Sequence, residues 1–233
     1  MLQKISYDSL FLAQHGWLTS RFHFSFAQYH NPNNMHFGVL RVLNDDTILP
    51  QTGFDTHPHR DMEIVSYIIN GEITHKDSMG HDKVLKRGEV QYMSAGTGVF
   101  HSEHNKHQTE NLRLLQMWFL PSSSNLSPVY GEEHYTFEER HNKLLPIVSS
   151  YQGHASIKIH QDVNLYVTEL DKDLEINFTL TKNRQVYCVQ IEGSASFNEI
   201  TLSHGDAMQV THEPQINIKA LENAHILLIE MAE

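Results

Sequence analysis

The chain has 233 residues, of which 39% are hydrophobic and 19% charged, and its formal net charge is −11. This composition excludes a disordered chain, and the acidic balance disfavours direct binding to nucleic acid. No apolar stretch is long enough to cross a bilayer, so we expect no membrane insertion. The single cysteine, Cys188, excludes an internal disulfide, and a cytoplasmic protein is therefore expected.

Short apolar segments with strand-like patterns recur along the whole chain. In chain order they are 22–26, 37–43, 64–69, 112–120, 174–180, 216–220 and 224–229. Turn sequences rich in Asn and Gly separate them, and no segment shows a long helical period. One short helix is expected near residues 8–15. The sequence therefore predicts an all-β protein built of barrels or sandwiches.

A Ser- and Pro-rich stretch at residues 121–128 follows a strong predicted strand. We place the domain boundary there, which gives an N-terminal domain 1–128 and a C-terminal domain 129–233. The two halves share a faint pattern, in which a turn sets Gly before an acidic residue and an apolar strand. This pattern indicates an internal duplication.

Two histidines that are two residues apart, His57 and His59, stand out among the 18 histidines of the chain. In a β-strand, residues i and i+2 point to the same face, so both imidazoles can project into one barrel. A second pair with this spacing, His101 and Glu103, follows a predicted strand and a tight turn. On neighbouring strands the two pairs would converge on one point.

Three imidazoles and one carboxylate form a mixed nitrogen and oxygen ligand set. Such a set suits Fe, Mn, Ni, Cu or Zn better than Ca or Mg. Four protein ligands leave coordination positions open, which is typical of a catalytic centre rather than a closed structural one. The nearby His75, His81, His104 and His107 are expected to lie in exposed loops.

Several large apolar side chains near these pairs either line a substrate cavity or fill an ordinary core. They are Phe22, Phe24, Phe26, Met35, Phe37 and Met93. Trp118 is expected in the core. Arg60 either orients an anionic substrate or forms a surface ion pair.

The metal motifs and their surroundings resemble the pirin family of the cupin superfamily. The resemblance rests on Pro58-His59-Arg60 and on segments 73–80 (ITHKDSMG) and 91–103 (QYMSAGTGVFHSE). It is dense over residues 20–120 and weaker afterwards. The resemblance implies a bicupin, with two antiparallel β-barrels in one chain.

The resemblance also implies a ligand set and its location. One metal ion would be held in the N-terminal barrel by His57, His59, His101 and Glu103. Iron is the usual metal in the family, and Zn, Mn, Ni or Cu are alternatives. The C-terminal barrel is expected to be degenerate and to hold no metal, because it lacks a His-x-His pair and its histidines are isolated.

A rival for the carboxylate ligand is Glu63. The general cupin pattern places its glutamate shortly after His-x-His, which is the position of Glu63. On an unbroken strand Glu63 would lie about 13 Å beyond His59, out of ligand reach. The pirin pattern favours Glu103, so we expect Glu103 to complete the ligand set and to serve as the catalytic base.

Three functions are compatible with these features. The resemblance implies a quercetin 2,3-dioxygenase that cleaves a flavonol with dioxygen. The first alternative is a metal-containing regulatory protein that binds a protein partner without turnover, and the second is another small-molecule cupin enzyme. The expected ligand is a small aromatic substrate, and the expected oligomeric state is a monomer.

Overall fold

The computed structural model describes all 233 residues, which form two compact units. The N-terminal unit is Phe11–His134, and the C-terminal unit combines Met1–Leu10 with Tyr135–Glu233. Nearly all regular structure is β-strand, and the helices are the one-turn α1 (Phe137–Arg140) and the 3-10 turn η1 (Tyr7–Ser9). Neither has the length and apolar character that crossing a bilayer requires.

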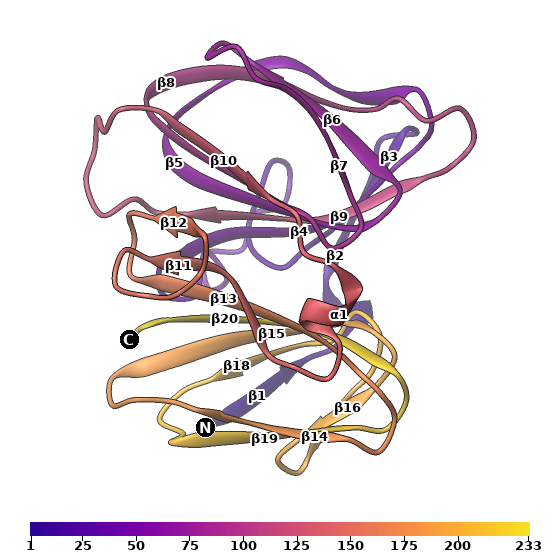
Figure 1. Ribbon diagram of the computed structural model, residues 1–233, viewed down its shortest axis with the longest axis vertical. Helices are drawn as coiled ribbons and strands as arrows, with labels where there is room; N and C mark the ends of the chain where they lie inside the picture. The colour runs from indigo at the N-terminus through magenta and orange to yellow at the C-terminus, as the bar shows by residue number, and fades with distance from the viewer. The chain divides into compact units, whose positions relative to one another are not determined.

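The N-terminal unit is a single sheet of nine strands (Figure 1), in the order β2-β3-β4-β9-β5-β8-β6-β7, with β10 paired to β8. The strands are β2 (Phe11–Gln14), β3 (Leu18–Phe22), β4 (Leu40–Ile48), β5 (Thr52–Asn70), β6 (Glu72–Asp77), β7 (Asp82–Lys86), β8 (Val90–Asn105), β9 (Leu112–Phe119) and β10 (Val129–Glu133). Leu18 from β3 and Leu85 from β7 pack in one buried cluster. The sheet therefore folds over so that one face becomes an interior.

The C-terminal unit is a sandwich of two sheets. The larger sheet has the order β1-β18-β15-β20-β13-β11-β12 and the smaller one β14-β19-β16-β17. The strands are β1 (Leu2–Ile5), β11 (Leu145–Ser150), β12 (Ile157–Ile159), β13 (Val163–Leu170), β14 (Glu175–Thr179), β15 (Arg184–Glu192), β16 (Ala195–Phe197), β17 (Ile200–Leu202), β18 (Ala207–Val210), β19 (Gln215–Ala220) and β20 (Ala224–Ala232). Cys188 from the larger sheet and Phe197 from the smaller one share its apolar core.

These units confirm the all-β prediction with two cupin-type domains, but neither unit is a closed barrel. Each sheet ends in edge strands, which are β2 and β7 in the N-terminal unit. The two units also differ from the expected division at residues 128 and 129. Strand β1 pairs with β18 and so belongs to the C-terminal unit, whereas β10 pairs with β8.

Two local predictions near the N-terminus were wrong. Residues 8–15 form no α-helix, because Phe11–Gln14 pairs with β3 in a hairpin that turns at Gly16, a glycine with φ of 77°. The predicted strand 22–26 ends at Phe22. Beyond it Ser25 bonds to Asn34 and Asn31, so the alternating pattern continues through a turn.

Candidate metal centre and its cavity

Strands β5 and β8 bring three of the predicted ligands together. His57 and His101 are direct partners in the register of these strands, which places their side chains on the same face. The Nε2 atom of His57 lies 3.0 Å from that of His59 and 3.0 Å from that of His101. The register shifts on either side of this pair, between Phe54 and His57 and between His59 and Asp61. The predicted convergence of the two motifs is therefore present for the three imidazoles.

Two of the three imidazoles, those of His59 and His101, are in the form that can bind a metal. Burial, with the neighbouring His101 and His57, lowers the pKa of His59 to about 4. Burial and the neighbouring His57 and His75 lower the pKa of His101 to about 3. Both rings are therefore neutral at physiological pH, which is the form that binds a metal.

The outer nitrogens of the rings differ in their surroundings. Nδ1 of His57 lies 2.8 Å from the carbonyl oxygen of Asp55, which accepts a hydrogen bond from it and directs Nε2 toward the cluster. Nδ1 of His101 is buried without a hydrogen-bond partner. The three Nε2 atoms at this spacing cannot all form hydrogen bonds with one another, so a cation bound between them fits this donor set.

Glu103 is buried beside the triad and is held by two carboxamides. Gln116 Nε2 donates to its Oε2 at 2.8 Å, and Gln91 Nε2 lies 3.5 Å from its Oε1. The carboxylate groups with His101 and His75, whose ligand atoms lie within 4.8 Å of one another. His101 therefore belongs both to the triad and to this second group. The four predicted ligands, however, do not all lie within that distance of one another.

The position of His75 was predicted incorrectly. It lies on β6, directly opposite Glu103 in register, and its side chain is fully buried rather than in an exposed loop. Its Nε2 lies 3.1 Å from Asp77 Oδ2, its Nδ1 lies 3.1 Å from Gln91 Nε2, and its ring stacks on Tyr130. Burial along β6 does not alternate, since Ile73, Thr74 and His75 are all buried, so no local pattern indicated this position.

The rival carboxylate, Glu63, faces away from the cluster. The adjacent Ile64 packs into the interior with Met93, and neighbouring residues of a strand point to opposite faces. Glu63 is buried on the other face, where its Oε1 accepts a hydrogen bond from the Tyr92 hydroxyl.

A cavity of about 300 Å³ extends from the triad. Its apolar wall consists of Trp17, Leu18, Phe22, Phe26, Ala27, Phe54 and Trp118. Trp118 stands edge-on to His59, with ring centroids 4.8 Å apart, so it lines the cavity instead of filling the core. Phe24, Phe37 and Met93 are ordinary core residues. Arg60 is exposed and contacts Asn125 and Asp61 at the surface.

The cavity runs from an open mouth to a polar floor. His15 and Ala27 are exposed at the mouth, whereas Asn44, Asp46 and Gln116 are buried. Burial and the nearby carboxylates Asp45 and Glu103 raise the pKa of Asp46 to about 7. Sequence reasoning missed this floor, because polar residues within a strand are usually assigned to a solvent-exposed face.

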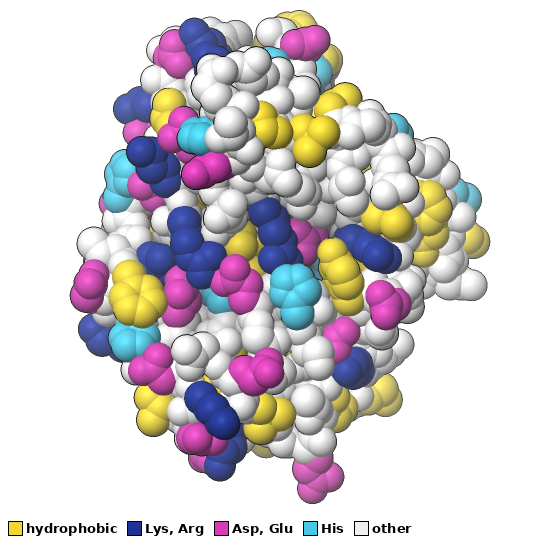
Figure 2. All heavy atoms as spheres, turned by 90° about the vertical axis from the view of Figure 1, so that its right-hand side faces the viewer, with side chains coloured by type: hydrophobic (Ala, Val, Ile, Leu, Met, Phe, Trp, Pro, Cys, Tyr) yellow, Lys and Arg dark blue, Asp and Glu magenta, His cyan; other side chains and the backbone are white.

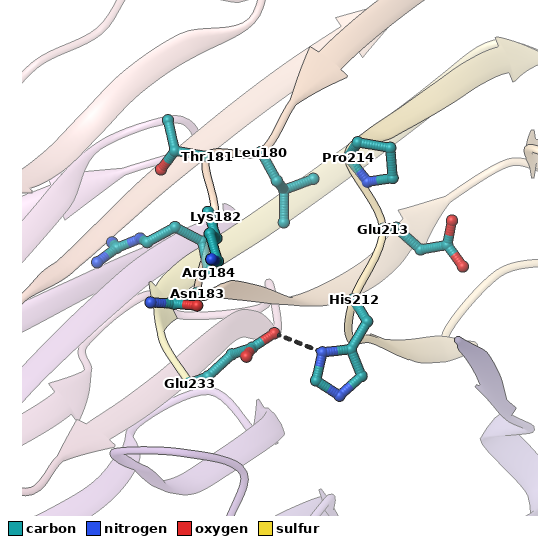
Figure 3. Close-up of a pocket in the computed structure, with 9 residues that line it drawn as sticks. All are labelled: Leu180, Thr181, Lys182, Asn183, Arg184, His212, Glu213, Pro214 and Glu233. Carbon is teal, nitrogen blue, oxygen red and sulfur yellow. Dashed lines mark ion pairs between the residues drawn. The ribbon is translucent and has the colours of Figure 1, made fainter.

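The C-terminal unit offers a different kind of pocket. It is an open pocket of about 380 Å³, and Figure 3 shows charged side chains of both signs among the residues that line it. His212 Nδ1 pairs there with Glu233 at 3.1 Å, and Arg184 is engaged with Glu230 and Asp162. Acidic and basic side chains are likewise mixed over the surface drawn in Figure 2.

Two antiparallel β domains, with a histidine triad beside an apolar cavity in one of them, define a two-domain cupin. Residues 6–119 match the family model Pirin, and residues 146–231 match that of the quercetinase C-terminal cupin domain. The chain belongs to the pirin family, as the sequence motifs predicted.

Known relatives extend over the whole chain. A quercetin 2,3-dioxygenase from Escherichia coli K12 is 40% identical over 219 residues, which are 94% of each chain. A pirin-like protein from Caulobacter vibrioides is 38% identical over 233 residues and covers 100% of both chains. The crystal structure of the bacterial pirin YhhW from Escherichia coli in complex with nickel(II) has a TM-score of 0.94 at 36% identity, covering 100% of this chain and 99% of that chain.

Proposed function

We propose that this protein is a metal-dependent dioxygenase that cleaves flavonols such as quercetin. The observation that carries the proposal is the convergence of three imidazoles at an apolar cavity that opens to solvent. The names of the relatives support the same substrate class.

The residues proposed to hold the metal are His57, His59, His101 and Glu103. Their donor atoms fit a divalent transition metal, because His59 and His101 are neutral and the Nε2 atom of His57 lies 3.0 Å from the Nε2 atoms of both. We propose iron as the native metal, with nickel as the first alternative, since a bacterial pirin has been crystallised with nickel(II). A bound metal supplies redox chemistry for dioxygen and acidifies a hydroxyl group that binds to it.

The chain's own residues would bind and orient the flavonol. The aromatic wall of the cavity, which includes Trp17, Phe54 and Trp118, provides flat apolar surfaces for a fused aromatic ring system. Burying the heterocycle there excludes water from the reacting carbons. Ring opening with dioxygen then releases carbon monoxide.

Glu103 is proposed as the base that takes the proton from the 3-hydroxyl group of the flavonol. Its carboxylate borders the cavity, and Gln116 and Gln91 hold it in place. A fixed carboxylate within reach of the hydroxyl is the arrangement that general-base catalysis needs.

The open mouth of the cavity favours an enzyme over a regulatory protein without turnover. A metal centre with a purely structural role needs no passage from solvent, whereas His15 and Ala27 border such a passage here.

The proposal is tested with purified protein loaded separately with iron and with nickel. Quercetin consumption and carbon monoxide release are followed in air and under argon. Turnover with one carbon monoxide per quercetin, dependent on dioxygen and metal, is expected. Metal-loaded protein that binds quercetin but releases no carbon monoxide in air would contradict the proposed reaction.

A further inference from the structure

The floor of the cavity carries polar atoms without partners. Asn44 and Asp46 are 3% and 2% exposed, and both line the cavity. The Oδ1 atoms of both side chains are buried without a hydrogen-bond partner. Ser20 lies opposite Asp46 in the strand register, and its hydroxyl stabilises the ionised form of the Asp46 carboxyl group. An unpaired buried oxygen destabilises a fold, and native structures therefore contain few of them.

The strand register explains how these side chains reach the cavity. On β4, Asn44, Asp46 and Ile48 share one face, and Ile48 packs into the interior cluster. Asn44 lies opposite Gln116 of β9, the residue that holds Glu103. The polar floor therefore begins beside the proposed catalytic carboxylate and continues along β4 to Asp46.

The floor is also separate from the ion pairs of the same strand. Asp45 points to the opposite face, where Arg113 donates to both of its oxygens at 2.9 and 2.7 Å. Asp46 has no such cation. Two adjacent acidic residues thus have different surroundings: one is paired in a salt bridge, and the other faces a cavity large enough for a ligand.

We propose that Asn44 and Asp46 recognise a hydroxyl group on the part of the flavonol that reaches the cavity floor, so that they select hydroxylated substrates. The inference rests on the proposed function and adds to it the residues that determine substrate specificity. A phenolic hydroxyl both donates and accepts, so it can donate to Asn44 Oδ1 while it accepts a hydrogen bond from the protonated carboxyl group of Asp46. An unsubstituted ring leaves both oxygens unpaired.

The protein contains its own probe for this test. Its two tryptophans, Trp17 and Trp118, both line the cavity, so intrinsic fluorescence reports ligand binding independently of turnover. Quenching is titrated under argon, at one fixed metal load, with quercetin and with a panel of flavonols that each lack one hydroxyl group.

The variants separate hydrogen bonding from packing. Asp46→Leu keeps the branched shape of the side chain but replaces both oxygens with larger methyl groups, and we expect roughly tenfold weaker binding of quercetin. Asp46→Asn keeps an acceptor and a donor, so its affinity should remain near that of the wild type. Thr168→Val is the matched control, since Thr168 is buried in the C-terminal unit with an equally unpartnered hydroxyl.

The result that supports the inference is a loss specific to one hydroxyl group. For the flavonol that lacks this group, Asp46→Leu and wild type should bind equally well. Equal affinities of all variants for every flavonol would overturn the inference and leave the proposed function intact. A wild-type protein that no flavonol quenches would overturn both. Circular dichroism of each variant checks folding. If Asp46→Leu does not fold, Asn44→Ala replaces it in the test, because it removes the other unpaired oxygen and should show the same hydroxyl-specific loss of affinity.

Discussion

The interiors of the two units differ although both are built from antiparallel strands. The buried cluster between the sheets of the C-terminal unit contains only apolar side chains, from Leu170 to Leu228. The interior of the N-terminal unit contains the histidine triad, Glu103 and a cavity of about 300 Å³. Most of the buried polar atoms without partners lie in this unit, Asn44 and Asp46 among them, whereas the C-terminal unit has such atoms at Thr168 and Gln190, outside its apolar cluster.

The same kind of β architecture therefore encloses a packed apolar core in the C-terminal unit and a cavity in the N-terminal unit. Close packing of apolar residues contributes stability, and the C-terminal unit follows that rule. A cavity lined with unpaired polar groups lowers the free energy of unfolding. The N-terminal unit is therefore less closely packed where the histidine triad and its cavity lie. The predictions below test this contrast, beginning with the largest expected effect.

Replacing a ligand of the triad should abolish the metal centre. His101→Ala removes the imidazole that belongs to the triad and also lies close to Glu103. We expect metal affinity to fall by at least about 100-fold, with loss of turnover. Metal stoichiometry after dialysis measures the effect. His212→Ala, in the charged pocket of the C-terminal unit, should retain the wild-type stoichiometry. Equal metal loss in both variants would remove the distinction between the units.

Truncation in the apolar core should have the opposite signature. Phe197→Ala opens a cavity in the C-terminal unit and should lower the free energy of unfolding by about 3–5 kcal/mol. Urea denaturation measures this change. The metal stoichiometry of the folded variant should stay that of the wild type, and a drop in it would mean that the second core supports the metal centre directly.

The buried acid should give stability a dependence on pH. The pKa of Asp46 is about 7 in the folded protein, whereas an aspartate in water has a pKa of 3.8. Between these values only the folded state binds the proton, so this group's contribution to stability decreases as pH rises from about 4 to 7. Over that range Asp46→Asn should gain roughly 3 to 4 kcal/mol relative to the metal-free wild type. Parallel stability curves for the two proteins would show that Asp46 does not titrate in this way.

The carboxamide that positions Glu103 should have a smaller effect. Gln116→Leu removes the hydrogen bond to Oε2, and we expect metal affinity to fall by about 10- to 100-fold while the triad remains. Competition with a chelator measures this affinity. Gln190→Leu, at a buried glutamine of the C-terminal unit, is the control that should match the wild type.

The convergence of the three histidines could be predicted because the spacing of the two motifs follows strand geometry directly. His57 with His59, and His101 with Glu103, are each two residues apart, and that spacing alone places both members on one face. Most long apolar runs likewise became strands, as in β9 and β20, because length and β-branched composition specify them.

Other features depend on pairing between distant segments. His75 meets Glu103 only through the register of β6 with β8, and Asp46 faces the cavity only because β4 lies between β3 and β9. Strand β1 joins a strand about two hundred residues away. The sequence around a residue does not show which distant strand will pair with it, so the burial of His75 and Asp46 could not be predicted.

The most direct test of the central claim is anomalous diffraction from crystals of the metal-loaded protein. We expect one strong anomalous peak per chain, bounded by the Nε2 atoms of His57, His59 and His101, with Glu103 beside it. A principal peak in the C-terminal unit, or none among these three imidazoles in protein that retains its metal, would contradict it.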